Sequence, residues 1–407
     1  MHRKAIPRIE LSLCVCLIAA IQLLSPGLAC AQTPKTLYVA VNTLRNGPAC
    51  GAQTQPCRTI SQAVANAAPG DFIEVGPGIY GDVDGDGDAD SAGEEASIGV
   101  GGKALTVYSK FGAAQTIIRA PRSPDLRTIV VSIVGDNTTF GRRNGGFTIV
   151  GDTSGFGEGS EGVTIVGGSN VVVEGNVVTD NSAGGFVVIV QQHTATGDIT
   201  LLGNVAMRNG GGFAISEANF PANRVWLEGN VAADNALQGF VLVEPANELR
   251  PGPGHVLRRN LATRNQIGFD LRSGAATVEG NVALANTQVG IQSRGQVCPA
   301  CPILQPNQIK GNTVIGNSIA GFRLLQGSQE TSLTGNNIYG NGEAAAGCGL
   351  INDSGHAVAA TNNYWGKADG PGPNPGDRAH TVCILSGTTT GIPFSSTPFP
   401  IEVIPTN

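Results

Sequence analysis

Five aspartates occupy alternate positions in one nine-residue stretch of this 407-residue chain. They are Asp82, Asp84, Asp86, Asp88 and Asp90. Carboxylates this close repel one another unless a cation lies among them, and short loops of alternating Asp and Gly wrap Ca²⁺ with oxygen ligands. The stretch departs from the helix-flanked calcium loop, because Gly93 stands at the twelfth position counted from Asp82, where that loop has an acid. We therefore predict a structural Ca²⁺ site here, with a solvated acidic loop as the alternative.

A second set of charged residues recurs at a fixed distance from a repeated asparagine pair. The residue before the second Asn is charged in four successive copies, Asp180, Arg208, Asp234 and Arg264. Side chains stacked at strand spacing attract when their signs alternate, as they do here. The plain interpretation is a ladder of surface ion pairs worth ~0–1 kcal/mol each. The alternative is a catalytic role, for which acidic and basic side chains have suitable chemistry.

A third set lies two residues before the first Asn of each pair, and one of its members stands beside a tryptophan. The signs alternate through Glu228, Arg258, Glu279 and Lys310. Strand alternation places Leu227 inward, so Trp226 and Glu228 face outward together. An exposed Trp next to a carboxylate is able to stack on a sugar ring. We predict ligand contacts at Trp226, Glu228 and Arg258, with a second ion-pair ladder as the alternative.

The elements that must position these residues are seven copies of one repeat, in which two Asn stand five residues apart and Gly with an apolar residue follows. The pairs are Asn176 and Asn181, Asn204 and Asn209, Asn230 and Asn235, Asn260 and Asn265, Asn281 and Asn286, Asn312 and Asn317, and Asn336 and Asn341. Val, Ile and Leu alternate with polar residues over short runs, which indicates strands. A unit of about 27 residues holds three short strands and three bends but cannot bury its apolar face alone, so the copies must stack as a parallel β-helix.

Stacking also explains why the repeated residue is asparagine. Its side chain has both a carbonyl and an amide NH₂, so copies in register hydrogen-bond along the stack. We expect these Asn to be structural rather than catalytic, and to tolerate the left-handed backbone that sharp bends need. The Gly before the apolar residue, as in Gly212-Phe213, is expected at positive φ where the coil turns inward.

With these motifs the chain resembles the right-handed parallel β-helix proteins of the pectate-lyase-like superfamily. The likeness is carried by the G-N-x-x-x-x-N repeats, by Pro56-Cys57-Arg58-Thr59-Ile60 and Gly76-Pro77-Gly78-Ile79-Tyr80, and by the closing Asn362-Asn363-Tyr364-Trp365-Gly366. It covers roughly residues 36–370. The resemblance implies an all-β, right-handed parallel β-helix solenoid of about 10–12 coils. It implies no single activity, because the superfamily includes lyases, hydrolases, adhesins and non-enzymes.

The chain divides into four segments. Residues 1–31 have the basic start, apolar core and Ala29-Cys30-Ala31 ending of an export signal, so we expect cleavage near Ala31 and a secreted, periplasmic or cell-surface protein. Residues 32–70 hold a first strand and an amphipathic helix over Arg58–Ala68, which we expect to cap the open strand edges. Residues 71–366 form the β-helix, and 367–407 form a Gly/Pro-rich tail. No run after the signal is long and apolar enough to span a membrane.

Six cysteines remain after the signal, and an even number in an exported chain indicates disulfides. They are Cys50, Cys57, Cys298, Cys301, Cys348 and Cys383. Proximity along the chain favours Cys50–Cys57, Cys298–Cys301 and Cys348–Cys383, while other pairings stay open. The spacing of Cys298 and Cys301 also fits a redox pair or half of a zinc site, although no second Cys/His pair accompanies it.

The composition of the chain limits the classes of molecule that it is expected to bind. The formal net charge is −6, which disfavours nucleic acid and anionic membranes. We expect a monomer that acts as a non-catalytic scaffold or binding protein for polysaccharide or another envelope glycan. The alternative that the resemblance implies is a polysaccharide lyase or glycoside hydrolase acting on uronic-acid polymers at the outer wall near 180–264. The sequence lacks the Asp-Asp and Gly-His-Gly motifs of the hydrolase members.

Overall fold

The computed structural model describes residues 33–86, 93–121, 128–152, 159–190, 197–217, 223–243, 254–272, 274–295, 305–330, 332–342, 348–371 and 388–401. The predicted export signal lies outside these residues. Pro34–Asn407 form one compact unit.

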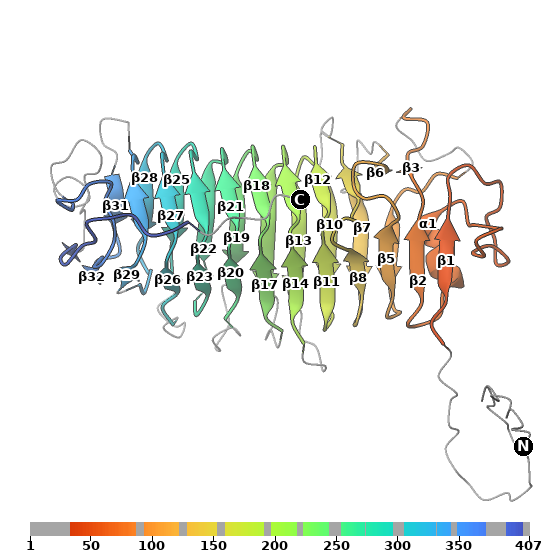
Figure 1. Cartoon of the computed structure of the whole chain (residues 1–407), viewed down its shortest axis with the longest axis horizontal. Helices are drawn as coiled ribbons and strands as arrows, with labels where there is room; N and C mark the ends of the chain where they lie inside the picture. Colours follow the sequence, from red (N-terminus) through yellow and green to blue (C-terminus); the bar gives the residue numbers. More distant parts are fainter. Residues whose placement is uncertain are drawn as a thin grey trace, which may run out of the picture. The chain divides into compact units, whose positions relative to one another are not determined.

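Three parallel sheets run along this unit and enclose its core (Figure 1). Sheet 1 consists of β1 (Thr36–Val39), β2 (Phe72–Val75), β5 (Thr106–Ser109), β8 (Thr139–Gly141), β11 (Val171–Glu174), β14 (Ile199–Leu202), β17 (Val225–Glu228), β20 (Val256–Arg258), β23 (Thr277–Glu279), β26 (Gln308–Lys310) and β29 (Leu333–Thr334). Sheet 2 consists of β3 (Gly78–Gly81), β6 (Thr116–Arg119), β9 (Thr148–Val150), β12 (Val177–Thr179), β15 (Val205–Met207), β18 (Val231–Ala233), β21 (Leu261–Thr263), β24 (Val282–Leu284), β27 (Thr313–Ile315) and β30 (Asn337–Tyr339). Sheet 3 consists of β4 (Ile98–Gly101), β7 (Thr128–Val134), β10 (Ser160–Val166), β13 (Gly184–Val190), β16 (Gly211–Glu217), β19 (Gln238–Val243), β22 (Ile267–Arg272), β25 (Val289–Ser293), β28 (Ala320–Leu324) and β31 (Cys348–Asn352).

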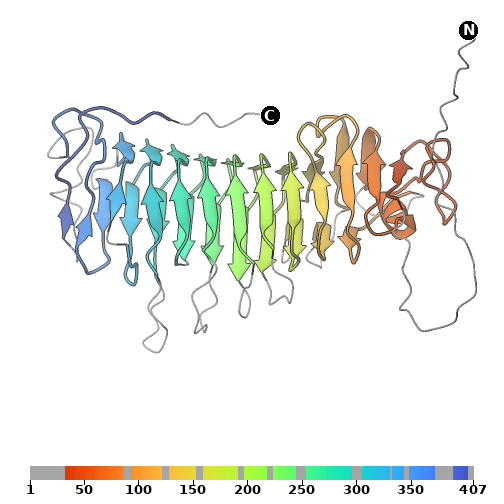
Figure 2. The ribbon, with the colours of Figure 1, turned by 60° about the horizontal axis from the view of Figure 1, so that its bottom comes forward.

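Each coil visits the three sheets in turn, so that β11, β12 and β13 precede β14, which returns to sheet 1 beside β11. Successive coils therefore lie against one another along the solenoid (Figure 2). This is the right-handed parallel β-helix that the sequence predicts.

Strand alternation sends every second residue into the core and fixes the register of the coils. The inward column of sheet 1 is Val173, Leu201, Leu227, Leu257, Val278, Ile309 and Leu333; each is at most 2% exposed, and Leu227 points inward as predicted. On sheet 3, four phenylalanines stack with ring centroids 4.8 Å apart, namely Phe186, Phe213, Phe240 and Phe269. Because the inward residues stack in register, the outward residues between them also form columns.

Both asparagine columns are hydrogen-bonded ladders inside the bends. Asn204 donates its backbone N–H and its Nδ2 to Oδ1 of Asn230, and Asn230 does the same to Asn260. The second column repeats the pattern from Asn209 to Asn235. Asn363 of the closing motif extends the first ladder, because its Oδ1 accepts from Asn336. The prediction that these residues have a structural role is confirmed.

Two expectations about the bends are wrong. The left-handed backbone belongs to the residue before each ladder Asn, such as Gly203, Asp180 or Arg208, and not to the Asn itself. The Gly before each apolar residue is not at positive φ either. A Cβ on Gly212 would lie 2.3 Å from the carbonyl oxygen of Gly239 in the next coil, so Gly is needed there for space rather than for conformation.

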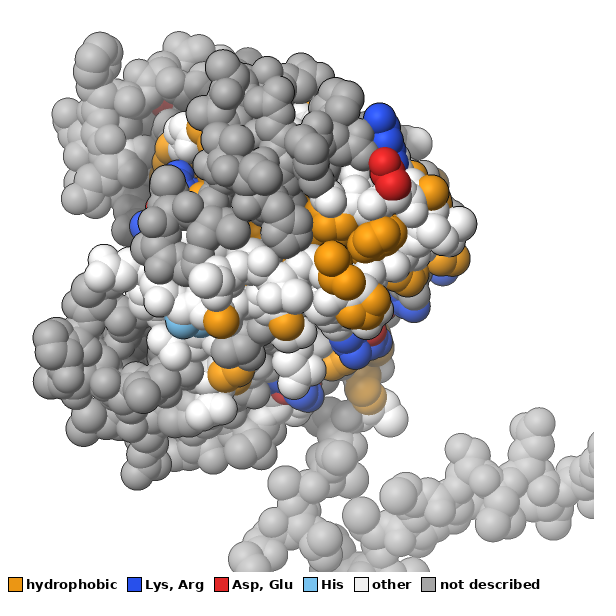
Figure 3. All heavy atoms as spheres, turned by 90° about the vertical axis from the view of Figure 1, so that its left-hand side faces the viewer, with side chains coloured by type: hydrophobic (Ala, Val, Ile, Leu, Met, Phe, Trp, Pro, Cys, Tyr) orange, Lys and Arg blue, Asp and Glu red, His pale blue; other side chains and the backbone are white. Residues whose placement is uncertain are grey.

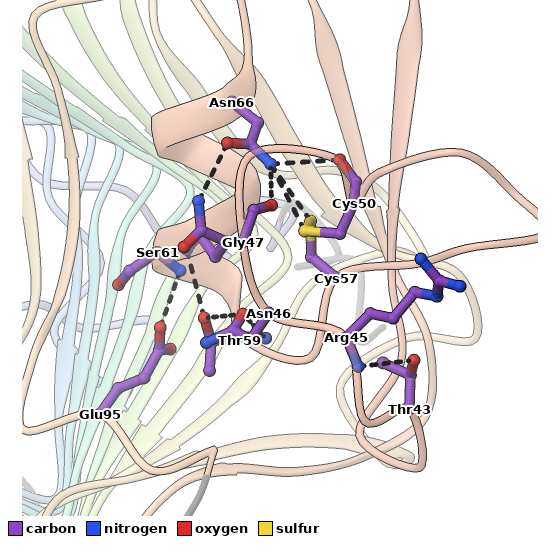
Figure 4. Close-up of a disulfide and its surroundings, with 11 residues drawn as sticks. Thr43, Arg45, Asn46, Gly47, Cys50, Cys57, Thr59, Ser61, Asn66 and Glu95 are labelled. Atoms are coloured by element: carbon purple, nitrogen blue, oxygen red, sulfur yellow. Dashed lines mark hydrogen bonds between the residues drawn. A yellow bond between two sulfur atoms is a disulfide. The ribbon is translucent and has the colours of Figure 1, made fainter.

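Helix α1 (Ile60–Asn66) is shorter than the predicted Arg58–Ala68, and it buries Ile60, Ala63 and Val64 in the core next to the first strands of sheets 1 and 3. Thr59 is its N-cap and accepts from the N–H of Gln62. The disulfide between Cys50 and Cys57 lies against this helix (Figure 4). Asn66 ties the two together by donating Nδ2 to the carbonyl oxygens of Gly47 and Cys50.

That disulfide confirms one predicted pair. Cys348 is also disulfide-bonded. Cys298, Cys301 and Cys383 lie outside the described residues too.

The C-terminal end of the solenoid is closed by the chain after β31. Trp365 is fully buried there. β32 (Val358–Ala359) pairs with β33 (Thr389–Thr390), and Phe399 exchanges backbone hydrogen bonds with the side chain of Asn337. Seen from this end, hydrophobic side chains gather on the face and Lys and Arg side chains lie toward its edge (Figure 3).

Candidate functional site

The acidic loop follows β3 at the start of the solenoid. Asp82, Asp84 and Asp86 bring one carboxylate oxygen each within 4.8 Å of one another. Asp82 is buried and accepts from the N–H of Gly85, whereas Asp84 and Asp86 are exposed. Glu94 adds a further carboxylate, which accepts from the N–H groups of Val83 and Asp84. Asp88 and Asp90, predicted to belong to the same site, lie outside the described residues.

The column predicted as catalytic lies at the bend between sheets 2 and 3. Arg208 binds Asp180 through Nε and Nη2 at 3.0 and 3.1 Å, and Arg264 binds Asp234 in the same way at 2.6 and 2.7 Å. All four side chains are 35–58% exposed. Hydrogen bonding to the guanidinium lowers the pKa of each carboxyl, and hydrogen bonding to the carboxylate raises the pKa of each arginine. The column consists of two bidentate ion pairs, as the plain interpretation expects.

Trp226 lies on the outer face of sheet 1, in a row with Val256, Thr277 and Gln308 of the next three strands. It is half-buried, and its Nε1 donates to Oε2 of Glu228 at 3.0 Å. The guanidinium carbons of Arg224 and Arg258 lie 5.5 and 6.0 Å from its ring centre. The ring is thus held against the wall by a hydrogen bond and flanked by cations.

The neighbouring column is Glu228, Arg258, Glu279 and Lys310, as predicted. Arg258 and Lys310 both pair with Glu279, at 2.9 and 3.4 Å. Hydrogen bonding to Arg258 is the main reason why the pKa of Glu279 is lowered. Glu228 pairs with Arg259 at 3.2 Å, a residue of the following bend that the sequence did not single out.

The same wall is hollowed beyond the Trp226 row. A cleft of about 550 Å³ is lined by Gln308, Lys310, Ser332 and Thr334, and closed at one side by the segment 305–307. Three strand steps of ~4.8 Å separate Gln308 from Trp226, so the cleft begins roughly 14 Å from the indole. Asn307 is fixed by the buried Glu330, which accepts from its Nδ2 at 2.6 Å. One wall therefore combines an aromatic ring, the polar side chains of Thr277 and Gln308, and a cleft.

Sequence reasoning missed a cluster on the outer face of sheet 3. Asp270 follows the inward Phe269 and so points outward, yet it is fully buried. Arg272, Arg294 and Gln292 all donate to its carboxylate. A signal was present in the sequence, because the residues after the Gly-Phe pairs read Val187, Ala214, Val241 and then Asp270.

Comparison with solved structures gives neighbours of the same fold at low identity. A tailspike protein named Dettilon gp208 matches with a TM-score of 0.52 at 14% identity over 88% of this chain, which spans 62% of that protein. A lacto-N-biosidase from Eubacterium ramulus matches with a TM-score of 0.51 at 10% identity over 89% of this chain and 67% of its own. These likenesses show the fold alone. No curated protein matches the sequence.

Two family models match the sequence. One, described as a periplasmic copper-binding protein (NosD), covers residues 249–368. Within the described residues, the group of three or more potential metal ligands is Asp82, Asp84 and Asp86, which lies outside that match and offers the oxygen ligands of hard cations rather than those of copper. The other model covers residues 44–255, just over half of the sequence, and its description is a protein of unknown function. The chain therefore belongs to the family DUF1565.

Proposed function

We propose that this protein binds polysaccharide on the outer wall of sheet 1 and does not cleave it. The observation that carries the proposal is Trp226, which lies on the outer face of sheet 1 with its Nε1 bonded to Glu228, in a row that continues through Val256, Thr277 and Gln308 to a cleft. An indole face packs on the apolar face of a sugar ring, and the flanking amide and hydroxyl groups hydrogen-bond its hydroxyls. The parallel strands give a ligand repeated contacts at intervals of ~4.8 Å.

The ion pairing of the acids supports a non-catalytic role. Glycoside cleavage needs a carboxyl whose pKa is raised, so that it is protonated near neutral pH. The pKa values of Asp180, Asp234 and Glu279 are all lowered by arginine. Arg208 and Arg264 have raised pKa values, which opposes a role as proton acceptor.

We infer export as well, and two observations support it. Cys50 and Cys57 form a disulfide of the kind that persists in oxidising compartments. The partial family match carries the description periplasmic. Among the described residues, no helix has the length and apolar character needed to cross a bilayer.

The deciding experiment screens the purified protein, with Ca²⁺ present, against neutral and uronic-acid polysaccharides by affinity electrophoresis. Product formation is followed in parallel as absorbance of unsaturated ends and as new reducing ends. Binding without products, lost in Trp226→Ala, supports the proposal. Turnover that disappears in Asp234→Ala would instead establish the alternative, a polysaccharide lyase or glycoside hydrolase.

We also propose that the loop after β3 binds Ca²⁺ as a structural ion. The convergence of Asp82, Asp84 and Asp86 supports this, because three carboxylates within 4.8 Å repel one another without a cation. Asp88 and Asp90 follow directly in the sequence and offer two more ligands. The ion would stiffen the insertion between β3 and β4.

A further inference from the structure

We propose that Arg272 and Arg294, on the outer face of sheet 3, bind the acidic group of a glycan, either a uronate carboxylate or a sulfate ester. This rests on the proposed polysaccharide binding and names the ligand class for it. The site is distinct from the Trp226 row, which lies on sheet 1.

The anchor of the site is the buried carboxylate of Asp270. Nε of Arg272 donates to Oδ2 at 2.9 Å, and its Nη2 lies 2.7 Å from the same oxygen. Nη2 of Arg294 donates to Oδ2 at 2.7 Å, and its Nε donates to Oδ1 at 3.3 Å. Nε2 of Gln292 completes the set by donating to Oδ1 at 3.1 Å. Two guanidiniums thus share one carboxylate, which leaves a local charge of +1.

The geometry leaves one edge of each guanidinium for a ligand. Both arginines use Nε and Nη2 on Asp270, so their Nη1 groups stay without a partner among the residues that the structure describes. The two side chains are 33% and 37% exposed. They come from neighbouring strand positions, because the N–H of Arg294 donates to the carbonyl of Leu271. Two forks set side by side by one acid match the paired oxygens of a carboxylate or sulfate.

The site borders the cleft of sheet 1. A small hollow lined by Ser293, Arg294 and Gly295 shares Gln305 and Asn307 with the lining of that cleft. Arg294 therefore lies near the cleft in which we propose that the glycan binds. Since the chain as a whole is acidic, with a formal net charge of −6, attraction of an acidic glycan must come from such a local cluster.

Asp270 acts in this proposal as a positioning residue. Replacing it therefore distinguishes positioning of the two guanidiniums from attraction by charge alone. Replacing Asp270 by Asn raises the local charge, so attraction by charge alone predicts tighter binding of an anion. Loss of the anchor frees both guanidiniums to rotate, so positioning predicts weaker binding. Attraction by charge alone and positioning by Asp270 thus predict opposite changes in the affinity for an anion.

The experiment measures dissociation constants for oligogalacturonate, dextran sulfate and neutral dextran by affinity electrophoresis, with the full exported chain. The first two ligands separate a carboxylate from a sulfate ester. Arg294→Lys and Asp270→Asn should each weaken the binding of the acidic ligand by about tenfold or more and leave dextran unchanged. Arg208→Lys and Asp180→Asn, which make the same changes in an ion pair on another part of the surface, should alter neither. If Asp270→Asn does not fold by circular dichroism, Arg272→Lys takes its place.

Unchanged or tighter binding of both acidic ligands in Asp270→Asn, or no effect of Arg294→Lys, would overturn this inference. So would wild-type protein that binds dextran but neither acidic ligand, and the proposed function would then stand. Wild-type protein that binds none of the three ligands would overturn the proposed function together with the inference.

Discussion

The backbone N–H and the side-chain amide of Asn204 both donate to Oδ1 of Asn230, at 2.9 and 3.1 Å, although the residues are 26 positions apart. Asn230 donates the same pair of hydrogen bonds to Asn260, and its Nδ2 also donates to the carbonyl of Leu201. Because each Asn of this column is fully buried, its polar groups depend on hydrogen bonds within the protein, and most of these bonds join neighbouring coils. The ladder holds the coils in register and so holds the outer walls in columns.

Asn230→Ala should therefore destabilise the protein strongly. It leaves the buried N–H of Asn204 without an acceptor, and each such group costs ~1–3 kcal/mol. The free energy of chemical unfolding measures the loss. Asp234→Asn in the same coil breaks an exposed ion pair worth ~0–1 kcal/mol and is the matched control. Equal losses in the two variants would contradict a central role for the ladder.

The raised pKa of Glu95 should make the stability of the N-terminal end depend on pH. Burial raises its pKa, although its carboxylate accepts from the N–H of Ser61 (Figure 4). A carboxyl whose pKa is higher in the folded state contributes stability at low pH, and this is lost as pH rises through the folded pKa. Glu95→Gln should thus gain melting temperature relative to wild type between about pH 4 and about pH 7. Glu174→Gln on the outer wall gives the background, and a gain that shrinks with pH would refute the assignment.

Calcium should raise the melting temperature if the loop after β3 binds it. Removal of the ion by a chelator returns three close carboxylates to mutual repulsion, so the melting temperature should fall. The double variant Asp84→Asn with Asp86→Asn should show no response to either calcium or chelator. If neither calcium nor the chelator changes the melting temperature of the wild type, the loop does not bind calcium.

The sequence predicted the columns better than the bends. Period and alternation were enough to predict three short strands in each coil and the inward position of Leu227, which the structure reproduces. The left-handed positions were misassigned because the residue before each ladder Asn varies between Gly, Asp, Arg, Ala and Asn, so no single letter marks them. A repeated Gly indicates that its position is constrained. It does not tell whether the cause is a lack of space for a side chain or a positive φ.

The outer walls were predicted only as rows. Trp226 and Glu228 were correctly placed together, because both depend on alternation along one strand. The pairing of Glu228 with Arg259 was missed, since it crosses from a strand to the next bend. Asp270 was missed for a related reason, because its partners Arg272 and Arg294 converge through rotamers that spacing does not encode.

The function proposed for this protein is that sheet 1 binds a glycan through Trp226 without cleaving it. The most direct measurement is the dissociation constant of the best polysaccharide ligand for wild type and Trp226→Ala, with product formation followed in the same samples. Phe111→Ala removes another exposed aromatic ring four strands away and serves as the control. Binding should be weakened roughly tenfold in Trp226→Ala, equivalent to ~1.4 kcal/mol, while Phe111→Ala binds like wild type and no products form. Equal affinity of wild type and Trp226→Ala, or cleavage of the ligand, would contradict the proposed function.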